Sequence, residues 1–267
     1  HSMRTLSMVA AAWLALLSLT ACDNTATQNS AGEVNLYSSR HYDTDLALYD
    51  DFTRDTGIQV NRIEAGADEL IARIQSEGES SPADLLITVD AGRLWRAEQA
   101  GIFQAVHSAV LTERLPANMR HPEGLWTGLS KRARVIIYNR EAGLPTPLED
   151  YTDLADPTHA GKVCIRSSSN IYNVSLMASI VAHLGEAAAE LWAEGVVRNF
   201  ARTPQSNDTG QIRAVASGEC QIAVVNTYYL ARLAASDDPA DLAVAEAVGI
   251  VFPGQQGSGT QCQPLRR

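Results

Sequence analysis

The sequence predicts an α/β protein in which strands and helices alternate as in a doubly wound sheet. Segments with period-two apolar alternation, or with near-continuous apolar character, take turns with segments whose apolar residues recur at helical spacing. The chain has 267 residues, of which 45% are hydrophobic. This is enough for one large domain or for two lobes, each with its own core.

The first half of the body has a βαβαβ pattern, which is the signature of a doubly wound lobe. Asp43–Asp45 is expected to open a helix, and Gly57 is expected to stop it. The run at 85–89 is almost entirely apolar, as in a central parallel strand. Strands are expected at 34–37, 58–63 and 85–89, and helices at 43–56, 68–76 and 91–100.

The second half of the body repeats the alternation without any visible sequence repeat. Strands are expected at 134–138, 163–165 and 222–225, and helices at 174–184, 187–200 and 209–217. Crossings between two lobes are expected at 131–134 and 224–226.

The two ends of the chain are expected to lie outside the fold. Residues 1–22 form a lipoprotein-type signal peptide, with a short apolar run that ends in a lipobox-like motif at Cys22. Lipidation of Cys22 is the favoured interpretation, and ordinary signal-peptidase cleavage nearby is the alternative; both imply export to the periplasm. Residues 23–32 are a polar tether, and 261–267 form an aberrant tail with neither strand alternation nor a helical face.

Charge and cysteine content exclude some classes of partner and site. The formal net charge of −10 disfavours binding to nucleic acid or anionic lipid headgroups. The cysteines lack metal-ligand spacing, so a zinc site has little support. Export permits a disulfide between Cys164 and Cys220, and two buried free thiols are the alternative.

Phenol groups recur at one kind of position in this pattern. His41 and Tyr42 follow the first expected strand, and Tyr172 follows the strand at 163–165 and a serine loop. Tyr228 and Tyr229 follow the strand at 222–225. Each group therefore lies where a strand leads into a helix N-terminus, the sheet edge where open α/β proteins bind ligands. A fourth helix cap, at 207–209, belongs to the same edge.

Four phenols and one imidazole would suit a small trivalent cation. A free phenol has a pKa of about 10, and a bound cation lowers the pKa of its ligands. Hard oxygen donors prefer hard cations, and imidazole tolerates iron. Four phenolates around a trivalent ion leave a net negative charge, which Arg40, Arg132 and Arg232 are placed to balance.

Simpler interpretations exist for each residue taken alone. A single tyrosine at a helix start usually packs, and a lone histidine is usually a satisfied surface group. Ser167–Ser169 could hold an oxyanion, but a simple turn is favoured. No nucleophile elbow, zinc-protease motif, P-loop or dinucleotide fingerprint is present, so no enzyme activity is expected.

Seven fragments together resemble the ferric-iron-binding periplasmic proteins of ABC iron importers, of the FutA/FbpA type. The resemblance runs from about Val34 to Thr260. The fragments are Tyr37–Tyr42, Ser81–Asp84, Leu94–Glu98, Lys131–Ile136, Arg166–Asn170, Gln205–Thr209 and Asn226–Tyr229.

The resemblance implies ligand roles for His41, Tyr42, Tyr172, Tyr228 and Tyr229, and charge-balancing roles for Arg132 and Arg232. It implies a type II periplasmic-binding-protein fold with a cleft between two lobes, made of 33–132 with 226–260 and of 133–225. Members of the family continue for several dozen residues past the loop near Thr260, so the second lobe is expected to be incomplete. A membrane permease and its ATPase are the implied partners of a monomeric protein.

The leading functional hypothesis is therefore capture of ferric ion and its delivery to an ABC permease, without any chemical reaction. A binding protein of the same fold for an oxyanion or a small organic acid, in which the tyrosines only pack, is the first alternative. An exported hydrolase on an α/β scaffold is the second.

Overall fold

A computed structural model describes residues 32–254 of the chain. The expected signal peptide, most of the tether and the tail at 261–267 lie outside these residues. The described residues form two compact units, 32–66 with 79–87 and 67–78 with 88–254. Within 32–254, no helix has the length and apolar character that a membrane crossing needs.

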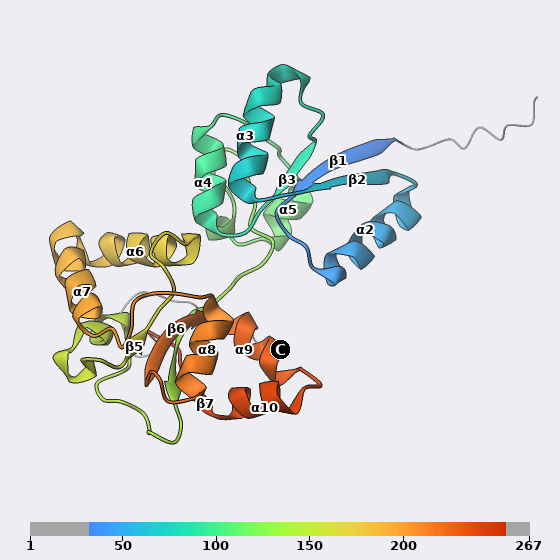
Figure 1. Ribbon diagram of the computed structural model, residues 1–267. Helices are drawn as coiled ribbons and strands as arrows, with labels where there is room; N and C mark the ends of the chain where they lie inside the picture. Colours follow the sequence, from blue (N-terminus) through green and yellow to red (C-terminus); the bar gives the residue numbers. More distant parts are fainter. Residues whose placement is uncertain (1–31, 255–267) are drawn as a thin grey trace, which may run out of the picture. The chain divides into compact units, whose positions relative to one another are not determined.

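The first unit contains a three-stranded parallel sheet. Strand β1 (Glu33–Ser38) lies between β2 (Gln59–Glu64) and β3 (Leu85–Ile87), as Figure 1 shows. The register places Leu36 opposite Leu85 on one side and opposite Arg62 on the other. Leu36 and its neighbour Tyr37 are buried, so β1 carries the core of this unit. The expected parallel arrangement of the first three strands is confirmed, but the central strand of this sheet is β1, and the run expected to be central forms the edge strand β3.

Helix α2 (Asp43–Thr56) connects β1 to β2. It ends at Gly57, whose positive φ of 73° suits glycine and whose N–H donates to the carbonyl of Thr53. The expected stop is confirmed. None of its residues is buried within the described part of the chain, and Leu48 and Phe52 are 65% and 41% exposed. Its apolar side chains are therefore not fully covered within residues 32–254.

Three further helices belong by their contacts to the second unit. They are α3 (Ala67–Glu77), α4 (Ala91–Gln99) and α5 (Ala109–Arg114). The first two confirm expected helices, whereas α5 was not expected. Short 3-10 turns occur at Gly78–Ser80, Ala117–Met119, Tyr151–Ala155 and Pro157–His159.

The second unit contains a mixed four-stranded sheet, made of β4 (Arg134–Asn139), β5 (Val163–Cys164), β6 (Ile222–Asn226) and β7 (Val248–Val251). The order is β5-β6-β4-β7. Strands β5 and β6 are parallel, and β4 is antiparallel to both of its neighbours. Strand β7 lies in the segment 226–260 that was expected in the first lobe. Its hydrogen bonds to β4 instead make it part of this sheet, and the remaining lobe boundaries stay a prediction.

Helices cover both faces of this sheet (Figure 1): α6 (Ile171–Leu184) and α7 (Glu186–Arg198) on one, α8 (Asp208–Ala216), α9 (Thr227–Ala234) and α10 (Pro239–Glu246) on the other. Successive side chains of a strand point to opposite faces. In β4, Val135 and Ile137 accordingly join the core under α8 and α9, whereas Ile136 joins the core under α6 and α7. This is the doubly wound arrangement that the sequence predicts.

A disulfide joins Cys164 at the end of β5 to Cys220 just before β6. Both residues are buried, and their Cα atoms are 5.9 Å apart. Of the two alternatives left open by the sequence, the structure shows the disulfide.

Candidate phenolate metal site

One edge of the second sheet gathers three helix N-termini. Strands β5 and β6 are parallel, so both end there, and α6 and α9 begin beyond them. Strand β4 is antiparallel to β6, and its first residue, Arg134, lies opposite Asn226 at the same edge. Helix α8 also begins there, because Asp208 accepts a hydrogen bond from the backbone N–H of Asn226. The expected convergence at a carboxyl edge is confirmed for this unit.

Three of the four expected tyrosine ligands meet at this edge. The hydroxyl oxygens of Tyr172 and Tyr228 lie 3.0 Å apart and share a hydrogen bond. The rings of Tyr228 and Tyr229 have centroids 4.3 Å apart and are tilted by 31°. All three residues are partly buried. The phenols therefore form one cluster, the phenol cluster below, contributed by α6 and α9.

An asparagine stands at the N-cap of each of the two helices. The side-chain oxygen of Asn170 accepts a hydrogen bond of 3.0 Å from the backbone N–H of Tyr172, which is an N-cap interaction. Asn226 occupies the N-cap of α9. Each tyrosine consequently lies in the first turn of its helix, where the unpaired N–H groups favour negative charge.

Two arginines lie beside the phenols. One terminal nitrogen of Arg132 is 3.4 Å from the hydroxyls of both Tyr172 and Tyr228, to which it donates. Its guanidinium carbon is 4.9 Å from the centroid of the Tyr228 ring, and that of Arg232 is 5.7 Å from the same centroid. Both arginines thus lie next to Tyr228, where cation–π attraction favours them. Their role in balancing phenolate charge stays a prediction.

The surroundings separate the acidities of the three phenols. Burial raises the pKa of Tyr228, and its hydrogen bond to Tyr172 raises it further. Burial also acts to raise the pKa of Tyr172, but the hydrogen bond from Tyr228 and the charge of Arg132 outweigh it, so the pKa of Tyr172 is lowered. Burial raises the pKa of Tyr229. Of the three phenols, Tyr172 is therefore the one whose pKa is lowered by its surroundings.

The other two expected ligands belong to the first unit. His41 is exposed, and Tyr42 is partly buried at the N-cap of α2. Arg40 makes two hydrogen bonds to Asp45, of 2.8 and 3.0 Å, and its guanidinium carbon is 4.9 Å from the Tyr42 ring centroid. The hydrogen bond to Asp45 raises the pKa of Arg40. Arg40 thus lies near Tyr42 as expected, but Asp45 already neutralises much of its charge.

A buried polar network beneath the phenol cluster was not predicted. It consists of Arg134, Arg166, Asn173 and Asp208, with Asn226 at its edge. Arg134 donates to Asp208 at 3.1 Å, to Asn226 at 3.0 Å and to Asn173 at 2.6 Å. The sequence signals that could have revealed it are the cap at 207–209 and the arginine-rich segment 131–134.

The serine loop before α6 is a turn. The hydroxyl oxygens of Ser167 and Ser169 lie 2.9 Å apart, and the backbone N–H of Ser169 donates to Ser167. These hydroxyls engage one another, which favours the turn over the oxyanion interpretation.

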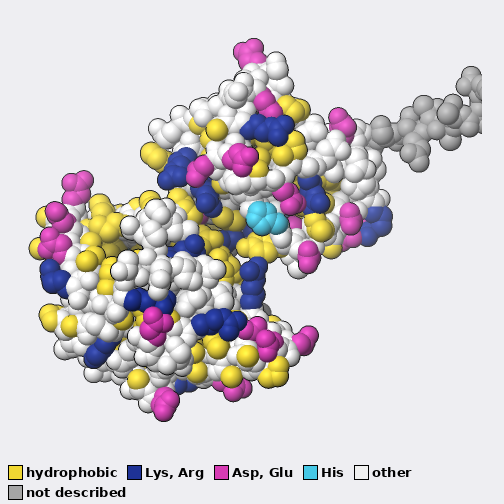
Figure 2. All heavy atoms as spheres, in the orientation of Figure 1, with side chains coloured by type: hydrophobic (Ala, Val, Ile, Leu, Met, Phe, Trp, Pro, Cys, Tyr) yellow, Lys and Arg dark blue, Asp and Glu magenta, His cyan; other side chains and the backbone are white. Residues whose placement is uncertain are grey.

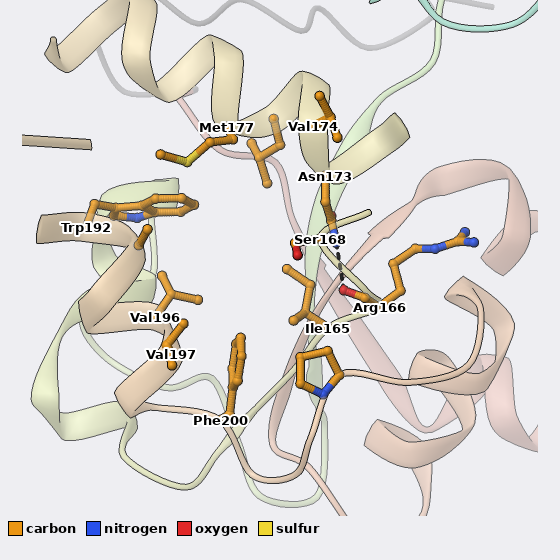
Figure 3. A pocket seen from close by; sticks show the side chains of 13 residues that line it. Ile165, Arg166, Ser168, Asn173, Val174, Met177, Trp192, Val196, Val197 and Phe200 are labelled. Carbon is orange, nitrogen blue, oxygen red and sulfur yellow. Dashed lines mark hydrogen bonds between the residues drawn. The ribbon is translucent and has the colours of Figure 1, made fainter. Parts of the chain in front are cut away.

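A separate apolar cavity of about 370 Å³ lies between α6, α7 and the loops that follow β5 and α7. Figure 3 shows Trp192, Met177 and Phe200 around it, whereas the guanidinium group of Arg166 points away from it. None of the three clustered tyrosines lines this cavity. It is therefore distinct from the phenol cluster.

Within residues 32–254, no three His, Cys, Asp or Glu side chains come together as a metal-binding group. On the face shown in Figure 2, acidic and basic side chains are interspersed with apolar ones. The phenols are therefore the candidate ligands that the described residues offer.

A parallel βαβ unit, followed by a mixed sheet with helices on both faces and polar groups gathered at its carboxyl edge, is the architecture of an open α/β protein that binds a ligand at that edge. The chain belongs to the bacterial extracellular solute-binding protein family, whose sequence model matches residues 80–259.

Curated relatives carry iron in their names. Iron uptake protein A1 of Synechocystis is 56% identical over 234 residues, which are 88% of this chain and 65% of the relative. The major ferric iron-binding protein of Neisseria meningitidis is 30% identical over 216 residues, 77% of this chain and 62% of that protein. The chain thus spans slightly less than two thirds of the length of these relatives.

Solved structures agree with this assignment. FutA (IdiA) from Trichodesmium, determined with iron and citrate ligands, is 59% identical with a TM-score of 0.81 and covers 85% of this chain and 72% of its own. Apo FutA2 from Synechocystis is 55% identical with a TM-score of 0.80, over 85% and 70% of the two chains. The resemblance stated from the sequence and the expected type II fold are confirmed.

Proposed function

We propose that the protein binds ferric iron as a transported solute, through His41, Tyr42, Tyr172, Tyr228 and Tyr229. The observation that carries this proposal is the phenol cluster, in which two hydroxyls lie 3.0 Å apart beside the guanidinium of Arg132. Neutral phenols at this spacing share a hydrogen bond, and the same spacing brings two hard oxygen donors within reach of one trivalent ion. The iron-related names of relatives at 56% identity support the same solute.

Nearby positive groups explain how phenols, rather than carboxylates, can act as iron ligands at this site. A cation near a phenol favours its ionised form, and Arg132 acts in this direction on Tyr172. The first turns of α6 and α9 add the positive ends of their helix dipoles. Binding of the ion itself lowers the pKa of the remaining phenols.

In the proposed role, the protein captures and releases ferric iron and catalyses no chemical reaction. The protein would act in the periplasm, where the expected lipid at Cys22 would tether it to a membrane. It would deliver iron to an ABC permease and its ATPase as a monomer. Stimulation of a reconstituted permease–ATPase pair by the iron-loaded protein, and not by the iron-free protein, tests this delivery.

Absorption spectroscopy with ferric citrate tests the binding step. A ferric–phenolate bond produces a visible charge-transfer band, so the wild-type protein should become coloured. The double variant Tyr228→Phe/Tyr229→Phe keeps both rings and removes both hydroxyls, and it should lose most of the band. Tyr138→Phe, which removes a hydroxyl from β4 outside the cluster, is the matched control and should keep it.

Two outcomes would contradict the proposal. One is a wild-type protein that stays colourless with ferric citrate; the other is a band that survives in the double variant. If phosphate or sulfate instead raises the melting temperature of a colourless protein, the oxyanion-binding alternative is favoured. Turnover of ester or peptide substrates would support the hydrolase alternative.

A further inference from the structure

A fully buried carboxylate lies at the centre of the network beneath the phenols. Asp208, the first residue of α8, has 0% exposure, and both of its carboxylate oxygens are hydrogen-bonded. One oxygen accepts from Arg134 at 3.1 Å and from the backbone N–H of Asn226 at 2.8 Å. The other accepts from Arg166 at 3.3 Å. A buried carboxylate is tolerated only when it is paired in this way.

The partners of Asp208 lead directly to the phenols. Asn226 is the N-cap of α9, and Tyr228 follows it by two residues. Arg134 donates to the side-chain oxygen of Asn173, which is the neighbour of Tyr172 on α6. Asp208 is therefore linked to both tyrosine-bearing helices, by one hydrogen bond to the backbone at the N-cap of α9 and, through Arg134, to the side chain of Asn173 on α6.

A second connection ties Asp208 to α6. Arg166 pairs with Asp208, and its carbonyl accepts a hydrogen bond of 2.8 Å from the side-chain amide of Asn173, drawn in Figure 3. The guanidinium carbons of Arg166 and Arg134 lie 5.3 and 5.9 Å from the centroid of the Tyr172 ring. Asp208 thus also holds two positive charges at fixed distances from this ring.

We propose that Asp208 is a positioning residue for iron. It fixes the separation of Tyr172 from Tyr228 and Tyr229, and it anchors the two guanidinium groups beneath them. This inference rests on the proposed function, because it assigns Asp208 a role in the same site. It differs from ordinary structural support in one measurable respect. Loss of Asp208 should change the ferric–phenolate bonds themselves, and not only the stability of the fold.

The decisive variant is Asp208→Asn, which keeps the shape of the side chain and removes its charge. Compared with the wild type, the iron-loaded variant should show a shifted charge-transfer band. It should also release iron to a chelator about 10- to 100-fold faster, because loss of a residue that supports metal ligands usually weakens metal binding by this factor. The band position, the release rate and the melting temperature are measured on the same samples.

Asn139→Ala is the matched control for lost stability. Asn139 is also a buried polar residue of the second sheet, and its amide donates to the carbonyl of Val215 at 2.7 Å. It lies at the other end of β4 from Arg134. This variant should melt earlier and keep the wild-type band and release rate.

A second variant covers the case in which Asp208→Asn fails to fold. Asn173→Ala removes only the connection from the network to α6 and leaves the ion pairs of Asp208 in place. It should shift the band in the same direction, by a smaller amount.

The outcomes separate the two proposals. If the wild type binds iron and Asp208→Asn changes only the melting temperature, the positioning role is overturned and the proposed function stands. If Asp208→Asn does not fold, an unshifted band in Asn173→Ala overturns the positioning role equally. A wild type without any ferric–phenolate band overturns the proposed function first.

Discussion

The hydroxyl groups of Tyr172 and Tyr228 lie 3.0 Å apart, although 56 residues of sequence separate them. The parallel pairing of β5 with β6 accounts for this closeness, because it ends both strands at one edge. The helices that follow then start side by side and carry their tyrosines in the first turn. This relation between two residues is the basis of the predictions for iron.

The first prediction concerns His41 and Tyr42, the proposed ligands of the first unit. Loss of a residue that hydrogen-bonds to a metal ligand weakens metal binding by roughly 10- to 100-fold. His41→Ala removes a proposed ligand itself, so it should weaken ferric binding by at least as much. The remaining phenolates should still give a visible band. Tyr42→Phe should weaken binding and also reduce the band intensity, because it removes one phenolate. Competition titration with citrate measures both effects. The exposed His107→Ala is the control and should bind like the wild type.

The second prediction concerns Arg132, which lies against two hydroxyls. Its positive charge acts to lower the pKa of Tyr172. In Arg132→Gln that pKa should rise, so protons should compete with iron up to a higher pH. Iron loading, followed by the visible band from pH 5 to pH 9, should have its midpoint at a higher pH than in the wild type. Equal midpoints would contradict this. Arg54→Gln removes an exposed arginine of α2 and controls for net charge.

The third prediction concerns the disulfide between Cys164 and Cys220. It closes a loop across a sequence separation of 56 residues, so its removal should lower the free energy of unfolding of this unit by about 2–4 kcal/mol. Urea unfolding with and without a reductant measures the loss. The double variant Cys164→Ala/Cys220→Ala should show a similar loss and no further response to the reductant. A reductant effect that persists in the double variant would point to other thiols.

The fourth prediction concerns Gly195, within α7. A Cβ atom there would lie 2.7 Å from the Cβ and 3.0 Å from the carbonyl oxygen of Ala155. Alanine favours a helix by up to about 1 kcal/mol over glycine, but the backbone of the Tyr151–Ala155 turn cannot move aside cheaply. Gly195→Ala should therefore destabilise the protein by about 1–3 kcal/mol in urea.

The iron-binding spectrum of Gly195→Ala should match that of the wild type, because the residue lies outside the phenol cluster. Leu191→Ala changes an exposed position of the same helix and should stay within about 0.5 kcal/mol of the wild type. If Gly195→Ala proves stabilising, the close approach of α7 to the turn is not a constraint.

Local patterns predicted most of the elements. Helix α2 and its stop at Gly57 followed from the acidic start at Asp43–Asp45 and from the glycine, and the structure agrees, although Tyr42 rather than Asp43 occupies the N-cap. The positions of Tyr172 and Tyr228 at helix starts followed from strand and cap signals that lie within a few residues of each other. Such signals are physically local, so a single sequence carries them.

In the second sheet, strand direction and long-range pairing could not be predicted in the same way. The apolar runs in β4 and β6 show that both strands are buried, but burial is the same for parallel and antiparallel neighbours. Arg134 and Asp208 form an ion pair although they are 74 positions apart, and such a pair produces no periodic pattern in the sequence. The choice between a disulfide and free thiols likewise depended on the distance between Cys164 and Cys220, which only the folded structure gives.

Strand β4 should tolerate substitutions more easily than insertions or deletions. Val135 and Ile137 belong to one core and Ile136 to the other, while Arg134 begins the strand beside the phenols. Substitution by an apolar residue of similar volume would disturb one face only. Deletion of a single residue would turn the side chains on each face of the strand to the opposite face. It would also move Arg134 away from Asp208. Among functional descendants of this chain, we expect substitutions within 134–139 but neither insertions nor deletions.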